Sequence, residues 1–313
     1  MSPSADERWL VTGASGLLGA NAVLDLAGSR RVVGAARRMR KMGGVQPLAV
    51  DLSSPSERIG LVERSRADVI LHTAAVSSIE ACERDPDLAR ELNVRAAKDL
   101  AAQARELGAQ FIHVSTDAVF DGKRGGYVPT DTPSPSTEYG RTKADAEAAV
   151  LDVYPAAIVA RVNFYGWSPS RSRSLAEFFY NRLSRGENAP GFTDVTVSTM
   201  YVRTLIDHLI ALQGAGASGI VHAVNDQPTT KFDFGVTLSR AFGFDPGRVV
   251  RSTSSEHLSI GRGSNLTLNT DRLHEIIDVP NTTQESDLQR LAEDASSGRR
   301  TALSAFSPEE KNP

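Results

Sequence analysis

The sequence is poor in the features that would define a partner or a cofactor on their own. It has one cysteine, Cys82, among 313 residues, which excludes an internal disulfide and any metal site built from several cysteines. The formal net charge is −3, so we expect neither nucleic acid nor an anionic membrane as a partner. No apolar run approaches the roughly 20 residues of a membrane helix, and the N-terminus lacks a signal-peptide core. We therefore expect a cytoplasmic protein.

What the chain does contain is a regular alternation of apolar runs and helical patterns. Strands are expected at residues 8–13, 30–38, 45–53, 67–75, 109–116 and 156–166, and helices at 16–29, 85–109 and 136–154. In the helix at 85–109, Leu88, Leu92, Ala96 and Leu100 recur every four residues, and Gly108 stands at the C-terminal cap. Continuously apolar strands that alternate with helices predict an α/β fold, with a Rossmann-type doubly wound parallel sheet.

After Gly166 the rhythm changes, which predicts a small C-terminal substrate-binding lobe. We assign residues 1–165 to a dinucleotide-binding domain that is completed by about 199–225. Residues 166–198 and 226–295 would form the lobe, and the polar stretch 296–313 would be a frayed tail.

Three glycines follow the first expected strand at equal spacing: Gly13, Gly16 and Gly19. Between a strand and a helix, such glycines permit a tight turn, a close approach of backbone to pyrophosphate, and close packing of helix on strand. The alternative is a plain turn of small residues. The position directly after an N-terminal strand favours a dinucleotide loop.

The end of the second strand lacks an acidic residue and carries Arg37, Arg38, Arg40 and Lys41 instead. A carboxylate there would bind free ribose hydroxyls and repel a 2′-phosphate, whereas arginine can pair with that phosphate. The pattern favours NADPH, with NADH left open, and the alternative is a solvated basic turn.

Tyr139 and Lys143 are four residues apart and share a helix face. Taken alone, such a pair is more often a solvated surface. Ser115 and Thr116, however, end a strand at the same predicted sheet edge. Tyr139 could then exchange a proton with a substrate oxygen, while Lys143 lowers the tyrosine pKa and holds the nicotinamide ribose.

These motifs together resemble the extended short-chain dehydrogenases/reductases, and most closely the dTDP-4-dehydrorhamnose reductases and related sugar-nucleotide reductases. The resemblance rests on the glycine loop, "HTAA", "ELNVRAA", "STDAVFDG", the Tyr139/Lys143 pair and "NFYG", and it covers roughly residues 8–275. It implies reduction of a keto group on a nucleotide-linked sugar by NADPH, and a homodimer is compatible with it.

The resemblance implies three sets of site residues. The catalytic set is Thr116, Tyr139, Lys143 and Asn93, the last as a brace of the proton relay. The cofactor set is Gly13, Ser15, Gly16, Leu17, Leu18, Arg37, Arg38, Asp51, Leu52, Thr73, Ala74, Ala75, Tyr139 and Lys143. The substrate set is Val76, Ser77, Asp117, Ala118, Asn163 and Phe164.

The chain also departs from the patterns it resembles. Sugar-nucleotide dehydratases carry a glutamate at the place of Ala118, and the rhamnose reductases usually have Tyr there and Trp near Phe164, so dehydration is disfavoured and the sugar stays open. Some reductases dimerise through magnesium held by a glutamate at the place of Asn21, so we predict no such metal. Two alternatives remain: a nucleotide-sugar epimerase, and a non-catalytic regulatory subunit of methionine adenosyltransferase type.

Overall fold

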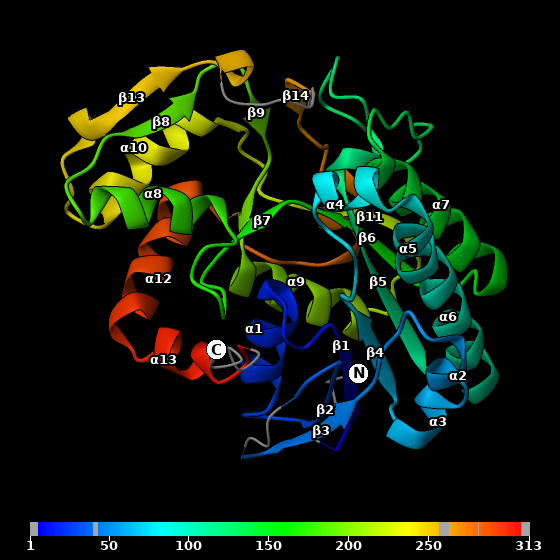
Figure 1. Ribbon diagram of the computed structural model, residues 1–313. Coiled ribbons are helices and arrows are strands. Elements are labelled where there is room, and N and C mark those ends of the chain that lie inside the picture. Colours follow the sequence, from blue (N-terminus) through cyan, green and yellow to red (C-terminus); the bar gives the residue numbers. More distant parts are fainter. Residues whose placement is uncertain (1–5, 40–42, 257–262, 281, 308–313) are drawn as a thin grey trace.

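The computed structural model describes residues 6–39, 43–256, 263–280 and 282–307, and a parallel sheet forms its centre (Figure 1). Its seven strands run in the order β11-β6-β5-β4-β1-β2-β3, and every neighbouring pair is parallel. The strands are β1 (Arg8–Thr12), β2 (Arg31–Ala36), β3 (Val45–Ala49), β4 (Val69–His72), β5 (Gln110–Thr116), β6 (Ile158–Val162) and β11 (Gly219–Ala223). The predicted α/β fold with a Rossmann-type sheet is confirmed.

Helices cover both faces of this sheet because its strands are apolar on both sides. One face is covered by α1 (Leu17–Leu26) and α9 (Val202–Gly214). The other is covered by α3 (Leu61–Ser65), α6 (Ala96–Leu107) and α7 (Glu138–Val153). Two short helices, α2 (Pro55–Arg58) and α4 (Ile79–Arg84), lie in the connections. Among the described residues, no helix is long and apolar enough to cross a membrane.

The helix predicted over 85–109 contains an irregular turn. Its parts are α5 (Pro86–Arg90), a π-helical segment (Glu91–Arg95) and α6, which ends at Gly108 as predicted. The wider π turn places Ala89 and Asn93 toward the interior. Leu88, on the apolar face expected from the four-residue spacing, is therefore 43% exposed. The irregular turn matters for the site because it buries the Asn93 amide.

The second half of the chain adds small sheets and helices beside the main sheet, in the upper left of Figure 1. The strand groups are β7 (Phe164–Tyr165) with β10 (Met200–Tyr201), β8 (Ala189–Phe192) with β13 (Val249–Ser252), and β9 (Thr196–Val197) between β12 (Thr229–Thr230) and β14 (Asn265–Leu266). The helices are α8 (Leu175–Leu183), α10 (Lys231–Ala241), α11 (Asp271–Ile276), α12 (Gln284–Ser296) and α13 (Arg299–Ser304), and short 3₁₀ turns span Asp117–Val119, Pro246–Arg248 and Ser254–Glu256. The core of this region is continuous with the core beneath α1 and α9.

The expectation of a frayed C-terminal tail is wrong for residues 299–306. Helix α13 packs back onto the molecule, and Leu303 and Phe306 are buried in the main core. Arg299 forms an ion pair with Asp25 of α1 at 2.6 Å. The polar composition of the segment hid these two apolar anchors and the long-range ion pair. Residues 308–313 of the predicted tail lie outside the described residues.

Candidate active site

The loop between β1 and α1 places glycines where a side chain would collide with backbone. Gly13 has a φ of +66°, and a Cβ there would lie 2.8 Å from the Ala74 backbone. A Cβ on Gly19 would lie 2.2 Å from the Gly13 carbonyl oxygen. Gly16 caps α1 without a side chain, so the N–H groups of the first turn stay available. This cradle fits the pyrophosphate of a dinucleotide at a helix N-terminus.

The end of β4 lies directly against this loop. The Thr73 hydroxyl donates to the Thr12 carbonyl at 2.7 Å, and the Ala74 N–H donates to the Thr12 hydroxyl at 3.4 Å. The predicted contacts that flank the cradle are half-buried Ser15, Leu17, Ala74 and Ala75, and buried Leu18. Leu18 packs into the core, so it can offer only its backbone to a cofactor.

The predicted adenosine end lies after β2 and β3. Arg37 and Arg38 are exposed, and Arg37 lies close enough to Asp51 to help lower its pKa. The larger cause of that lowered pKa is the Ser53 hydroxyl, which donates to the Asp51 carboxylate at 2.7 Å. Leu52 is buried. The other two predicted basic residues, Arg40 and Lys41, lie outside the described residues.

Thr116 and Tyr139 meet at the carboxyl end of β5. The Thr137 hydroxyl caps α7 by accepting from the Gly140 N–H at 3.1 Å. A Cβ on Gly140 would lie 2.2 Å from the Ala118 carbonyl oxygen, so glycine lets the helix press against the turn after Thr116. Burial raises the pKa of Tyr139 to about 12, and its hydrogen bond with Thr116 offsets only part of that rise. Tyr139 is therefore protonated near neutral pH.

Lys143 is buried one helical turn further along α7. Its ammonium donates to the Val114 carbonyl at 2.7 Å and lies 3.0 Å from His113 Nε2. Burial lowers the pKa of Lys143 to about 8. The pKa of Tyr139 is raised rather than lowered, because burial of the phenol is the largest cause of its shift, so the expected lowering by Lys143 stays a prediction.

Asn93 connects the loop after β4 to α7. Its Oδ1 accepts from the Val76 N–H at 2.8 Å, and its Nδ2 donates to the Thr142 hydroxyl at 3.0 Å. Because Thr142 stands beside Lys143 in the chain, Asn93 braces the helix that carries the tyrosine and the lysine. Its part in a proton relay remains a prediction.

Among the predicted substrate residues, Asp117 and Ala118 lie in the turn after β5, and Asn163 bonds to it. Asp117 accepts from the Asn163 amide at 2.6 Å and from the Thr116 hydroxyl at 3.0 Å. Burial nevertheless raises the pKa of this carboxyl. The other members are half-buried Val76, Ala118 and Phe164, and exposed Ser77. Lys231, at the start of α10, acts electrostatically on Asp117, which brings the C-terminal region to this turn.

Sequence reasoning missed a buried ionic cluster behind the predicted catalytic residues. Glu147 of α7 pairs with Arg161 of β6 at 2.8 Å, and both side chains are almost inaccessible. The Ser115 hydroxyl donates to Glu147, and Arg161 lies 3.4 Å from His222 Nε2. A signal was available, because an arginine inside the apolar run "AIVARV" implies a buried partner.

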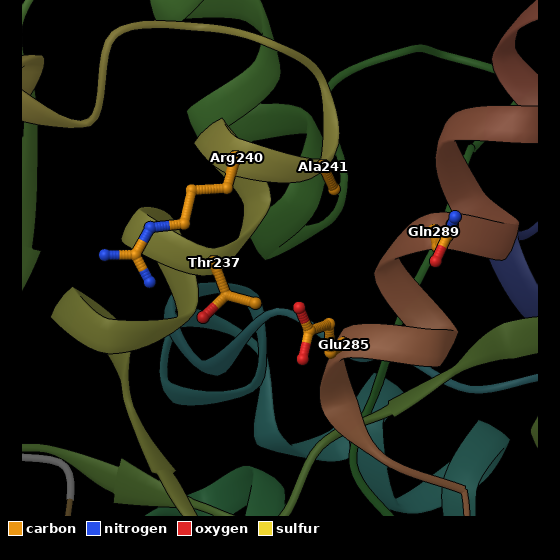
Figure 2. Close-up of a pocket in the computed structure, with 5 residues that line it drawn as sticks. All are labelled: Thr237, Arg240, Ala241, Glu285 and Gln289. Carbon is orange, nitrogen blue, oxygen red and sulfur yellow. The ribbon is translucent and has the colours of Figure 1, made fainter.

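A pocket of about 350 Å³ lies away from these residues, between α10 and α12 (Figure 2). It is lined by Thr237, Arg240, Ala241, Glu285 and Gln289. In Figure 2, Thr237 and Glu285 face one another across it. None of the predicted site residues lines this pocket, so it is separate from the candidate active site.

A glycine cradle at the carboxyl edge of a parallel sheet, beside a tyrosine and a lysine four residues apart, defines NAD(P)-dependent oxidoreductases of the short-chain dehydrogenase/reductase superfamily, and the chain is one of them. Residues 7–297 match the family described as "RmlD substrate binding domain", and the chain belongs to that family. This membership confirms the resemblance stated from the motifs.

Several curated proteins are similar over most of the chain. A probable low-salt glycan biosynthesis reductase of Haloferax volcanii is 32% identical over 79% of this chain and 84% of its own length. The dTDP-4-dehydrorhamnose reductase of Mycobacterium tuberculosis is 32% identical over 80% of each chain. Methionine adenosyltransferase 2 subunit beta of Rattus norvegicus is 28% identical over 85% of this chain and 81% of its own.

Solved structures share the fold at lower identity. The dTDP-4-dehydrorhamnose reductase of Bacillus anthracis in complex with NADP has a TM-score of 0.82 and 22% identity, covering 92% of this chain and 99% of that one. A UDP-glucose 4-epimerase of Thermotoga maritima with UDP-glucose has a TM-score of 0.78 and 20% identity, covering 91% and 97%. These similarities confirm the fold, and they do not identify the substrate.

Proposed function

We propose that the protein uses NADPH to reduce a keto group on a nucleotide-linked sugar. The observation that carries this proposal is the meeting of the Thr116 and Tyr139 hydroxyls at the sheet edge, beside the glycine cradle. When bound, NADPH supplies the hydride that adds to the carbonyl carbon. The chain itself must then bind and protonate the carbonyl oxygen as negative charge develops on it.

Tyr139 is suited to that proton transfer. Its raised pKa keeps the phenol protonated at neutral pH, as a proton donor in a reduction must be. A developing alkoxide is a far stronger base than a phenolate, so the transfer is downhill even from a weakly acidic phenol. The Thr116 hydroxyl is within hydrogen-bond reach of both Tyr139 and Asp117, which supports a role in orienting the phenol.

Lys143 supports the cofactor side of the reaction. Its ammonium is buried and held by acceptors on β5, one turn of α7 away from Tyr139. We propose that it binds the nicotinamide ribose, with Asn93 bracing the same helix through Thr142. The exposed Arg37 and Arg38 would bind the 2′-phosphate and so favour NADPH over NADH.

We propose that residues 166–198 and 226–295 form the lobe that binds the sugar nucleotide. Support comes from Asn163 and Lys231, which bring β6 and α10 to Asp117 beside the catalytic turn. The place of the magnesium ligand in some resembling reductases is Asn21, whose side chain is buried and accepts from Arg299. This contact supports the proposal that a dimer of this chain, if formed, does not use a metal there.

Net consumption of NADPH tests the proposed reaction against both alternatives. The experiment offers NADPH and a panel of nucleotide-linked 4-keto sugars, and follows the loss of NADPH absorbance together with the reduced sugar. Stoichiometric consumption is expected with at least one member of the panel. An epimerase would interconvert sugars without net loss of NADPH. Tight NADPH binding with no turnover, and a protein partner that co-purifies, would instead favour the regulatory subunit.

A further inference from the structure

His113 is a buried histidine that the mechanism above does not use. It lies on β5 with no accessible surface, and its Nε2 is 3.0 Å from Lys143 Nζ. The same ammonium donates to the carbonyl of Val114, the next residue of β5. An ammonium has three N–H groups, so two of them are directed into the sheet edge. The direction of the third is thereby fixed.

The protonation state of His113 follows from this contact. An ammonium can only donate, so Nε2 must accept, and the imidazole must be neutral with its proton on Nδ1. Burial, and then the charge of Lys143, hold the pKa of His113 well below its usual range, in agreement with a neutral ring. Nδ1 has no hydrogen-bond partner within the described part of the chain. The polar contact that His113 makes there is therefore the one with Lys143.

The ring of His113 is also held in place. It stacks on His72 of the neighbouring strand, with centroids 5.6 Å apart. His72 is itself fixed, because its Nδ1 lies 2.8 Å from the Thr12 hydroxyl at the end of β1. The Nε2 acceptor of His113 is therefore held within the sheet. Through His72 and Thr12 it is linked to β1, the strand that leads into the glycine loop.

We propose that His113 is a positioning residue of the reductase site, which orients the Lys143 ammonium and stabilises its positive charge in a buried place. Lys143 and Tyr139 share a face of α7, so the remaining N–H of the ammonium is available on the side that carries the phenol. A role in the reductase site assumes the proposed function. The orientation of the ammonium follows from the 3.0 Å contact between Lys143 Nζ and His113 Nε2.

Two variants of nearly equal size test whether His113 acts as a hydrogen-bond acceptor for Lys143 or only fills space in the core. His113→Gln keeps a carbonyl oxygen near the place of Nε2, whereas His113→Met has the same chain length and no strong acceptor. The Lys143 titration is followed by ¹³Cε NMR of labelled lysine, assigned from the signal missing in Lys143→Arg. We expect wild type and His113→Gln to titrate alike, and His113→Met to titrate about one pH unit lower or more, because the ammonium loses an acceptor. Equal titration of the Met and Gln variants would overturn the proposal.

A control addresses the general disturbance of the sheet. His208→Met replaces a buried histidine of α9, which packs on the opposite face of the sheet from α7, and should leave the Lys143 titration in place. If His113→Met does not fold, as judged by its melting curve, His113→Asn replaces it, since the shorter amide withdraws the acceptor toward Nδ1. The Asn and Gln variants should then differ in the same direction, and equal titrations again refute the role.

The consequence for function is read separately. At pH 8.5, His113→Met should bind NADPH more weakly than wild type, and the basic limb of its kcat/KM profile should move to lower pH, with His113→Gln restoring both. The NMR titration needs no substrate. A protein that reduces no sugar would therefore defeat the proposed function while the titration still decides the role of His113.

Discussion

The glycine loop and the C-terminal region are each stabilised by a different kind of contact. Around the glycine loop the constraint is steric: backbone approaches backbone so closely that Gly13 and Gly19 have no room for a Cβ. The C-terminal region shares the apolar core beneath α1 and α9, and buried side-chain hydrogen bonds add to that packing. Thr204 of α9 donates to Asp287 of α12 at 2.6 Å, and Tyr201 donates to Asp294. The first kind of contact depends on backbone alone, and the second depends on particular pairs of side chains.

The candidate active site lies where these two regions meet, and Tyr139 is the side chain on which the proposed reaction should depend most. Tyr139→Phe removes one hydroxyl and little volume, so fold and NADPH affinity should survive. The chemical step should slow by about 100-fold to 10,000-fold, the usual worth of a positioned acid. Single-turnover oxidation of NADPH with the keto-sugar panel measures this directly.

The same chain offers a matched control for that substitution. Tyr154 follows α7, and its hydroxyl donates to the Ala109 carbonyl at 3.1 Å, far along the helix from Tyr139. Tyr154→Phe should leave the chemical step within a few-fold of wild type. Undiminished oxidation by the Tyr139→Phe protein would mean that the Tyr139/Lys143 pair is a structural feature of the helix.

The Glu147–Arg161 pair joins α7 to β6 behind the candidate site, within the region of the main sheet. Arg161→Met leaves the buried carboxylate of Glu147 without its cation, and should lower the free energy of unfolding by about 3–5 kcal/mol. Replacing both residues, Glu147→Leu with Arg161→Met, removes the unpaired charge and should recover much of that loss. Urea denaturation of the three proteins decides. Equal stability of the single and double variants would show that the pair does not act as a pair.

Cofactor preference tests the outer end of the cradle. Replacing Arg37 and Arg38 by Ala should erase most of the preference for NADPH over NADH, about 1–3 kcal/mol for charge-assisted bonds. Arg31→Ala is the control, because Arg31 is an exposed arginine at the other end of β2, paired with Asp6. Equal dissociation constants of the two cofactors for the unmodified protein would contradict the 2′-phosphate assignment.

The two regions also differ in what their sequence could reveal. Gly13, Gly16 and Gly19 fall within seven residues of chain, so a local steric rule predicts the cradle they form. The Tyr139/Lys143 spacing is equally local. By contrast, Asn21 and Arg299 are 278 residues apart, and no local pattern in either segment predicts their hydrogen bond.

For some residues the sequence carried a signal whose meaning became clear only from the structure. Asn93 is a predicted site residue, but its burial depends on a π turn that the four-residue spacing of leucines does not encode. Arg161 is a charge inside an apolar strand, which implies a buried partner, yet that partner, Glu147, lies on a helix 14 residues earlier. His113 gave no signal, because a histidine in an apolar strand is ordinary until Lys143 is placed beside it.

The smallest expected effect concerns the loop at residues 167–174, together with the start of α8 up to residue 179. Glu177 already orders it by accepting backbone N–H bonds from Ser168 and Arg173, both at 2.7 Å, and Arg171 donates to Ser304 of α13. A sugar nucleotide bound under this loop should therefore add only modest protection from hydrogen exchange, concentrated in the exposed residues 170–173. The measurement compares NADPH alone with NADPH and the sugar nucleotide. Protection confined to residues 13–19 in both states would mean that the sugar nucleotide does not bind under this loop. That result would favour a dinucleotide-binding subunit over a reductase.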